Sequence, residues 1–309
     1  MSSSCTTTCE VDSRPGVHSN GQHQAMLAVL RFRRSSSRNE GERFLQAMIH
    51  VYIDDSGDQR KTEYVTCGGI LGEAFAVTVM ESFWATETKH LAKPFRSTEC
   101  ECQQGQFKTW EKSKCDQLMA SLVGILLEPS IRSGVFGVTI PIPLFDRVFP
   151  NRDKDDPLRL AVRHVLVNLC KLCRRYSERA RVWFESGPND ADMLRAYNDV
   201  RDFRFPNTSE RDRLAGVSFG NKTLIPLQAA DLAARECYKA GANAGIRPIR
   251  KPLNRLWGQA SFQLFGESCM LKLKEGNGPI SIEAIDGMGD ECHEHYAEAT
   301  PHSVKLIPI

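Results

Sequence analysis

The chain has 309 residues, a formal net charge of +2 and 25% charged residues. A chain of this length can bury a sizeable core, and its near balance of charge neither requires nor excludes a nucleic-acid partner. The 11 cysteines are an odd number, which excludes a complete disulfide framework and favours reduced thiols. Because no run of about 18 apolar residues is present, we expect a soluble, cytoplasmic protein with no membrane partner.

Composition divides the chain into three regions. Residues 1–46 are rich in serine and threonine and show little periodicity, which predicts a disordered tail. Residues 47–245 carry the strand and helix patterns of a folded domain. Residues 246–309 are rich in glycine and proline, with short strand-like pieces such as 280–282, and we expect them to pack on the domain or to trail from it.

Within the domain, the predicted elements begin with two strands, after which helices and strands alternate. Apolar runs bounded by turn residues predict strands at 51–53, 64–72, 134–140, 181–185 and 214–222. Apolar residues at helical spacing predict helices at about 73–91, 111–128, 158–176, 189–201 and 226–240. The segment 94–110 is expected to be irregular. This order predicts an α/β protein, with helices packed on a mixed sheet.

Three carboxylates occupy similar positions in these predicted elements. Asp54 ends the first strand, Glu185 ends the fourth strand, and Asp231 lies on the last helix of the domain. Burying a carboxylate costs free energy unless a cation or hydrogen-bond donors compensate its charge. Mg²⁺ and Mn²⁺ prefer oxygen ligands, and such ions can activate water and stabilise a leaving oxygen. The pattern therefore favours metal-dependent hydrolysis of a phosphodiester.

Each of these acids also has a structural interpretation. Asp54 and Glu185 lie just before Ser-Gly turns, which their side chains can stabilise. Asp231 can form an exposed ion pair with Arg235, which would contribute only about 0.3–0.5 kcal/mol. Helical geometry places Gln228, Asp231 and Arg235 on one face, opposite small residues that can press closely onto a sheet. The residues alone leave both interpretations open.

Two motifs resemble the domain-of-unknown-function 3800 family, a group of RNase H-like proteins. Residues 52–57, Tyr-Ile-Asp-Asp-Ser-Gly, are similar to the opening motif of that family, and residues 227–232, Leu-Gln-Ala-Ala-Asp-Leu, are similar to its late motif. Between them, Glu185 resembles the family's strand-borne glutamate, and residues 219–222 resemble the segment before the late motif. The resemblance spans roughly residues 48–245.

The resemblance implies an RNase H-like fold, in which helices flank a five-stranded mixed sheet and the acids gather beside its central strands. It implies that Asp54, Glu185 and Asp231 are catalytic and bind the metal, with Asp55 as a supporting or additional ligand. Asp55 replaces the glutamate that is usual in the family, and Arg96 stands where relatives often carry histidine. Arginine cannot serve as a general base or metal ligand, but it can bind phosphate.

From these observations we expect a metal-dependent phosphodiesterase or nuclease of RNase H-like type that acts on RNA or DNA with Mg²⁺ or Mn²⁺. In such an enzyme, Lys222, Gln228 and Arg96 would orient or contact the substrate. The alternative is a catalytically inactive RNase H-like protein that binds nucleic acid or acts as a scaffold, for example in a mobile element or defence system. The sequence does not distinguish RNA from DNA, endonuclease from exonuclease, or a monomer from a homo-oligomer.

Overall fold

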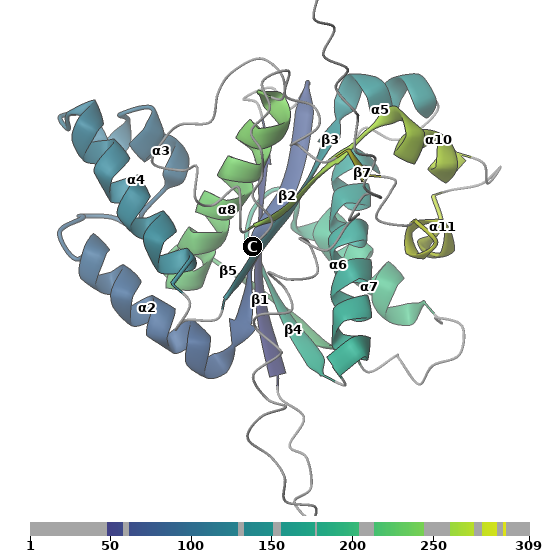
Figure 1. Cartoon of the computed structure of the whole chain (residues 1–309), viewed down its shortest axis with the longest axis horizontal. Helices are drawn as coiled ribbons and strands as arrows, with labels where there is room; N and C mark the ends of the chain where they lie inside the picture. Colours follow the sequence, from purple (N-terminus) through teal and green to yellow (C-terminus); the bar gives the residue numbers. More distant parts are fainter. Residues whose placement is uncertain are drawn as a thin grey trace, which may run out of the picture.

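The computed structural model describes residues 48–57, 62–128, 133–150, 156–176, 178–203, 213–243, 260–274, 280–288 and 293–294. The predicted tail at 1–46 lies outside these residues, as does much of the C-terminal region at 246–309. The described segments form an α/β protein in which one mixed sheet separates two layers of helices (Figure 1). None of the helices in these segments is long and apolar enough to cross a membrane.

The strands of the described residues lie in the order β5-β4-β1-β2-β3-β6-β7. β1 and β3 run antiparallel to β2, β4 is parallel to both β1 and β5, and β6 is parallel to β3 and antiparallel to β7. The bounds of the strands are β1 Met48–Gly57, β2 Tyr64–Glu73, β3 Gly134–Pro141, β4 Arg179–Glu185, β5 Leu214–Gly220, β6 Ser261–Phe265 and β7 His293–Glu294. The sheet therefore includes the five predicted strands and extends beyond them.

The C-terminal region supplies this extension and part of the core. β6 pairs with β3, and two short helices, α10 (Glu267–Lys274) and α11 (Ile282–Asp286), add buried apolar side chains. The expected strand-like piece at 280–282 is wrong, because the Ser281 side chain accepts a hydrogen bond from the Ala284 N–H and caps α11. The described parts of this region, 260–274, 280–288 and 293–294, are thus part of the sheet and core.

Helices cover both faces of the sheet. Figure 1 shows one layer on the left and the other on the right. The first layer contains α2 (Ala74–Thr88), α3 (Ser97–Glu101), α4 (Lys112–Leu126) and α8 (Ile225–Ala242). The second contains α5 (Ile142–Val148), α6 (Asp156–Tyr176) and α7 (Asp190–Asp202), together with α10 and α11.

The segment at 94–110, which was expected to be irregular, contains α3 and a short 3-10 helix, η2 (Gly105–Phe107). Phe95, Cys100 and Phe107 are buried in the first layer, and they anchor this segment beside α8. The spacing of its apolar residues is too irregular to predict a helix. Its packing brings Arg96 close to Glu185 at the carboxyl end of β4, and Ser97 close to Asp231 of α8.

Small residues on α8 and on the sheet allow the helix to approach the strands closely. A Cβ atom added at Gly68 of β2 would lie 2.7 Å from the Ala234 Cα, and one added at Gly137 of β3 would lie 2.6 Å from the Cys237 Sγ. The small-residue face of α8 therefore presses on the sheet, as its sequence predicts. This contact fixes where Asp231 lies relative to β1.

We expect Gly68→Ala to lower the free energy of unfolding by about 1–3 kcal/mol, because the new methyl group would meet the backbone of α8. Denaturant unfolding measures this change. Gly124→Ala in α4 is the matched control: no atom lies within 4 Å of the added Cβ, so it should stabilise the protein by about 0.4–1 kcal/mol. A Gly68→Ala protein as stable as the wild type would show that this contact does not hold α8.

Candidate functional site

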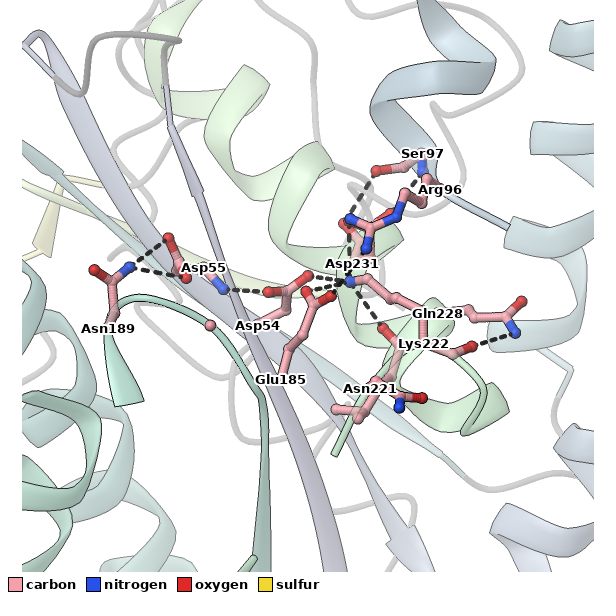
Figure 2. A network of polar contacts seen from close by, with 12 residues as sticks. Asp54, Asp55, Arg96, Ser97, Glu185, Asn189, Asn221, Lys222, Gln228 and Asp231 are labelled. Carbon is pink, nitrogen blue, oxygen red and sulfur yellow. Dashed lines mark hydrogen bonds and ion pairs between the residues drawn. The ribbon is translucent and has the colours of Figure 1, made fainter. Parts of the chain in front are cut away.

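Three parallel strands end side by side at one edge of the sheet. β4 lies between β1 and β5, and the carboxyl ends of these strands carry Asp54, Glu185 and, two residues after β5, Lys222. Open α/β sheets bind ligands at this kind of edge. The loop after β5 leads into α8, whose Asp231 faces the same place (Figure 2).

The alternation of side chains along a strand explains why Asp54 and Glu185 meet. Tyr52 pairs with Trp183 in the register of β1 and β4, and their stacked rings have centroids 6.2 Å apart in the first helical layer. Asp54 and Glu185 each follow two residues later and therefore point to the same face of the sheet. Val51 and Ile53 point to the opposite face, into the core beneath α6.

The Lys222 ammonium lies where the three predicted acids converge (Figure 2). Its Nζ is 2.5 Å from Asp54 Oδ2, 2.7 Å from Glu185 Oε2 and 3.2 Å from Asp231 Oδ1. The side chains of Asp54 and Lys222 are only 3% exposed, whereas those of Glu185 and Asp231 are 18% and 17% exposed. Solvent therefore reaches the cluster from the side of Glu185 and Asp231.

Burial and neighbouring charges shift the pKa values of these groups. Burial raises the pKa of Asp54 well above its ordinary value; Lys222 opposes this shift, and Asp231 and Glu185 add to it. Burial also acts to raise the pKa of Asp231, but Lys222 and hydrogen bonds from Ser97 outweigh it and keep that pKa below its ordinary value. The carboxylates outweigh the effect of burial on Lys222 and raise its pKa, so the ammonium stays charged.

Ser97 holds Asp231 in its orientation toward the cluster. The Ser97 backbone N–H donates to Asp231 Oδ2 at 2.6 Å, and its hydroxyl donates to the Asp231 carbonyl at 3.4 Å. Ser97 could not be predicted from the sequence, because a serine in a segment expected to be irregular gives no signal of a contact 134 residues away. Only the packing of α3 against α8 makes this contact.

Gln228 is buried and supports the backbone of Lys222. Its Oε1 accepts hydrogen bonds from Trp84 Nε1 at 3.0 Å and from the Phe95 N–H at 3.2 Å, and its Nε2 donates to the Lys222 carbonyl at 2.8 Å. Both ends of the amide are thus engaged inside the protein. Gln228 positions Lys222, and the direct substrate contact considered for it does not fit this burial.

The structure does not bring Asp55 into the cluster. Its two carboxylate oxygens each lie 3.3 Å from Asn189 Nδ2, just before α7, on the other side of β1 (Figure 2). Its backbone N–H donates to Asp54 Oδ1 at 2.8 Å. Because successive side chains of a strand alternate between its faces, Asp55 cannot share the site of Asp54, and the metal-ligand role expected for it does not fit the geometry.

Two arginines that the sequence placed near the acids have different surroundings. Arg96 lies on the solvent side of the cluster, with Nη2 3.6 Å from Glu185 Oε1 and a side chain that is 51% exposed. Arg235 pairs with Glu101 of α3 at 2.9 Å, while Asp231 faces Lys222 and Ser97. The exposed pair of Asp231 with Arg235, which was the structural alternative for this acid, is therefore not what the structure contains.

The cluster has the donor chemistry of a magnesium or manganese site, but an ammonium holds its centre. Asp54, Glu185 and Asp231 offer the oxygen ligands that these ions prefer. Across the described residues, no group of three or more His, Cys, Asp or Glu side chains is arranged to hold a metal ion, and the three acids are turned toward Nζ. They fit a metal ion only when Lys222 Nζ leaves the centre.

No family model matches the chain, and comparisons with curated proteins and with solved structures found no match either. The class that the fold and the site define is therefore an α/β protein with an acidic cluster around a buried lysine. What this cluster does must be inferred from its geometry.

We expect Gln228→Leu to lower the free energy of unfolding by about 2–4 kcal/mol, because Trp84 Nε1 and the Phe95 N–H would lose their acceptor inside the protein. Gln117→Leu, on the exposed face of α4, is the matched control and should change stability by no more than about 0.5 kcal/mol. Denaturant unfolding compares the two variants. Equal effects would contradict the positioning role of Gln228.

Proposed function

We propose that this protein is an RNase H-like, metal-dependent phosphodiesterase that cleaves nucleic acid. The observation that carries the proposal is the convergence of Asp54, Glu185 and Asp231 on one point at the carboxyl edge of the sheet. Three carboxylates around one ammonium leave negative charge uncompensated. Burial raises the pKa of Asp54, and the neighbouring Asp231 and Glu185 carboxylates add to that rise. A divalent ion neutralises such a cluster better than a single ammonium does.

The architecture supports the RNase H-like part of the proposal. The first five strands in chain order are neighbours in the sheet, both parallel and antiparallel pairs occur among them, and two of the acids stand on the adjacent strands β1 and β4. This agrees with what the resemblance to the domain-of-unknown-function 3800 family implies. The two motifs that carry the resemblance, at 52–57 and 227–232, each contribute an acid that contacts Lys222 Nζ, Asp54 and Asp231 respectively. A shared site is a stronger argument for function than the fold by itself.

In this proposal Asp54, Glu185 and Asp231 hold Mg²⁺ or Mn²⁺. The ion would activate the attacking water and stabilise the leaving oxygen of the phosphodiester. Ser97 keeps the Asp231 carboxylate turned toward the centre. Arg96, half exposed beside Glu185, would bind a phosphate of the nucleic acid through its planar guanidinium.

Substitution of single acids tests the proposed ligands. With Mn²⁺ and single-stranded, duplex and RNA–DNA hybrid substrates, we expect cleavage by the wild type. Asp54→Asn and Asp231→Asn should lower the cleavage rate by about 100-fold or more. Loss of a group that only hydrogen-bonds to a metal ligand already lowers metal affinity or activity by about 10–100-fold. Asp55→Asn is the matched control and should keep most of the activity, because its carboxylate faces Asn189.

Two outcomes of this assay would contradict the proposal. Cleavage by Asp54→Asn at the wild-type rate would place the activity elsewhere or in a contaminant. A loss in Asp55→Asn as large as in Asp54→Asn would show that the ligands are assigned wrongly.

Arg96 is expected to contribute a phosphate contact. In the Asp54→Asn background, adding Arg96→Gln should weaken nucleic-acid binding and reduce the slope of log K against log salt concentration by about one. Fluorescence anisotropy at several salt concentrations measures this. Arg147→Gln is the matched control, because Arg147 is 64% exposed and pairs with Glu267 of α10 in the other layer. An unchanged slope in the Arg96 variant would rule out the contact.

A second candidate is a catalytically inactive RNase H-like protein that binds nucleic acid or acts as a scaffold. The observation that favours it is the Lys222 ammonium, which compensates part of the charge of the acids without any metal. In addition, Arg96 offers phosphate binding but no general base. The cleavage assay separates the two candidates, because binding without cleavage at any Mg²⁺ or Mn²⁺ concentration favours the inactive protein.

A further inference from the structure

We propose that Lys222 is a built-in counter-ion, which occupies the acidic centre in the metal-free protein and which a divalent ion must displace. This inference rests on the proposed metal-dependent function and adds a residue that controls metal binding. It starts from the position of Nζ, which lies at the convergence of the acids rather than at the edge of the cluster (Figure 2).

The surroundings of Nζ resemble the oxygen shell of a small cation. Besides oxygens of Asp54, Glu185 and Asp231, the carbonyl of Leu227 lies 3.4 Å away. An ammonium has only three N–H groups, so four oxygens around it are more than it needs. Mg²⁺ binds oxygen at about 2.0–2.1 Å, which requires these oxygens to close in on the point that Nζ now occupies. The two cations therefore exclude each other.

The charges explain why a cation stabilises this centre and why a divalent ion can displace the ammonium. Asp54 is 2% exposed, so water cannot replace the cation beside it. An ammonium supplies one positive charge to the three carboxylates, whereas Mg²⁺ or Mn²⁺ supplies two. The greater positive charge of the divalent ion favours its exchange for the ammonium, and the loss of the contacts between Nζ and the carboxylates opposes this exchange.

The exchange needs only a side-chain movement. The backbone of Lys222 is held by Gln228 Nε2 at 2.8 Å, and the next residue, Thr223, donates its backbone N–H to Asn221 Oδ1 at 2.9 Å. The four-carbon side chain can swing toward the solvent side of the cluster, where Arg96 lies. There the ammonium would meet the phosphate that Arg96 is proposed to bind, so displacement would turn Lys222 from a counter-ion into a substrate contact.

Calorimetric titration with Mn²⁺ tests the competition directly. A wild-type molecule can bind Mn²⁺ only while Nζ is away from the centre, and the apparent affinity falls in proportion to the fraction of such molecules. If that fraction is about one in ten, Lys222→Met should bind Mn²⁺ about tenfold more tightly than the wild type. Lys239→Met is the matched control: Lys239 is a mostly buried lysine of the same helix as Asp231, and it pairs with Glu236 and Glu101 instead. Its Mn²⁺ affinity should equal that of the wild type.

Thermal unfolding gives a second readout that does not depend on activity. In EDTA, Lys222→Met should unfold on the order of 10 °C below the wild type, because Asp54 loses its counter-ion. Saturating Mn²⁺ should raise its Tm by more than it raises that of the wild type. If Lys222→Met does not fold without metal, Lys222→Met combined with Asp54→Asn should fold, since the uncompensated carboxylate is then gone.

The outcomes separate this inference from the proposed function. Equal Mn²⁺ affinities of the wild type and Lys222→Met would overturn the competition and leave the metal-dependent function intact. No Mn²⁺ binding by any variant would overturn the metal centre and the competition together. Tighter binding by Lys222→Met that Asp54→Asn abolishes supports both.

Discussion

The buried contact between the Lys222 ammonium and the Asp54 carboxylate is the interaction on which the rest of the site depends. Both groups are almost fully enclosed, and leaving one without the other would cost about 3–5 kcal/mol. Asp54, Glu185 and Lys222 lie at or just after the carboxyl ends of three neighbouring parallel strands, and α8, which packs on one face of the sheet, contributes Asp231. The site also depends on the glycines of β2 and β3 and the alanines of α8, because these small residues let α8 approach the sheet closely enough for Asp231 to reach Lys222.

Much of the fold could be predicted from the sequence because it depends on local patterns. Apolar runs between turn residues gave the first five strands, and helical spacing gave α2, α4, α6, α7 and α8. Which of the two acids, Asp54 or Asp55, reaches the cluster could also have been predicted from the alternation of side chains along a strand. Tyr52 and Asp54 point to one face of β1, and the residues between and beside them, Val51, Ile53 and Asp55, point to the other. That pattern is visible in the printed sequence once the strand is assigned.

The remaining features depend on contacts between distant parts of the chain. The sequence suggested Lys222 as a substrate contact but could not place its ammonium between three acids. Asp54, whose carboxylate lies nearest to Nζ in space, is 168 residues away in the chain. The same holds for Ser97 and Gln228, whose roles arise only when α3 and α2 pack against α8. β6 and α11 escaped prediction because they are short and lie in a glycine- and proline-rich region, where tertiary contacts outweigh local propensity.

The pairing of β6 with β3 has a consequence for how the protein is made. β3 emerges from the ribosome more than a hundred residues before the strand that covers its outer edge. Until Ser261–Phe265 arrives, the nascent domain exposes unpaired backbone groups along β3, which is a template for pairing with other chains. The arrival of β6 late in translation therefore removes a site at which the growing chain could pair with other chains.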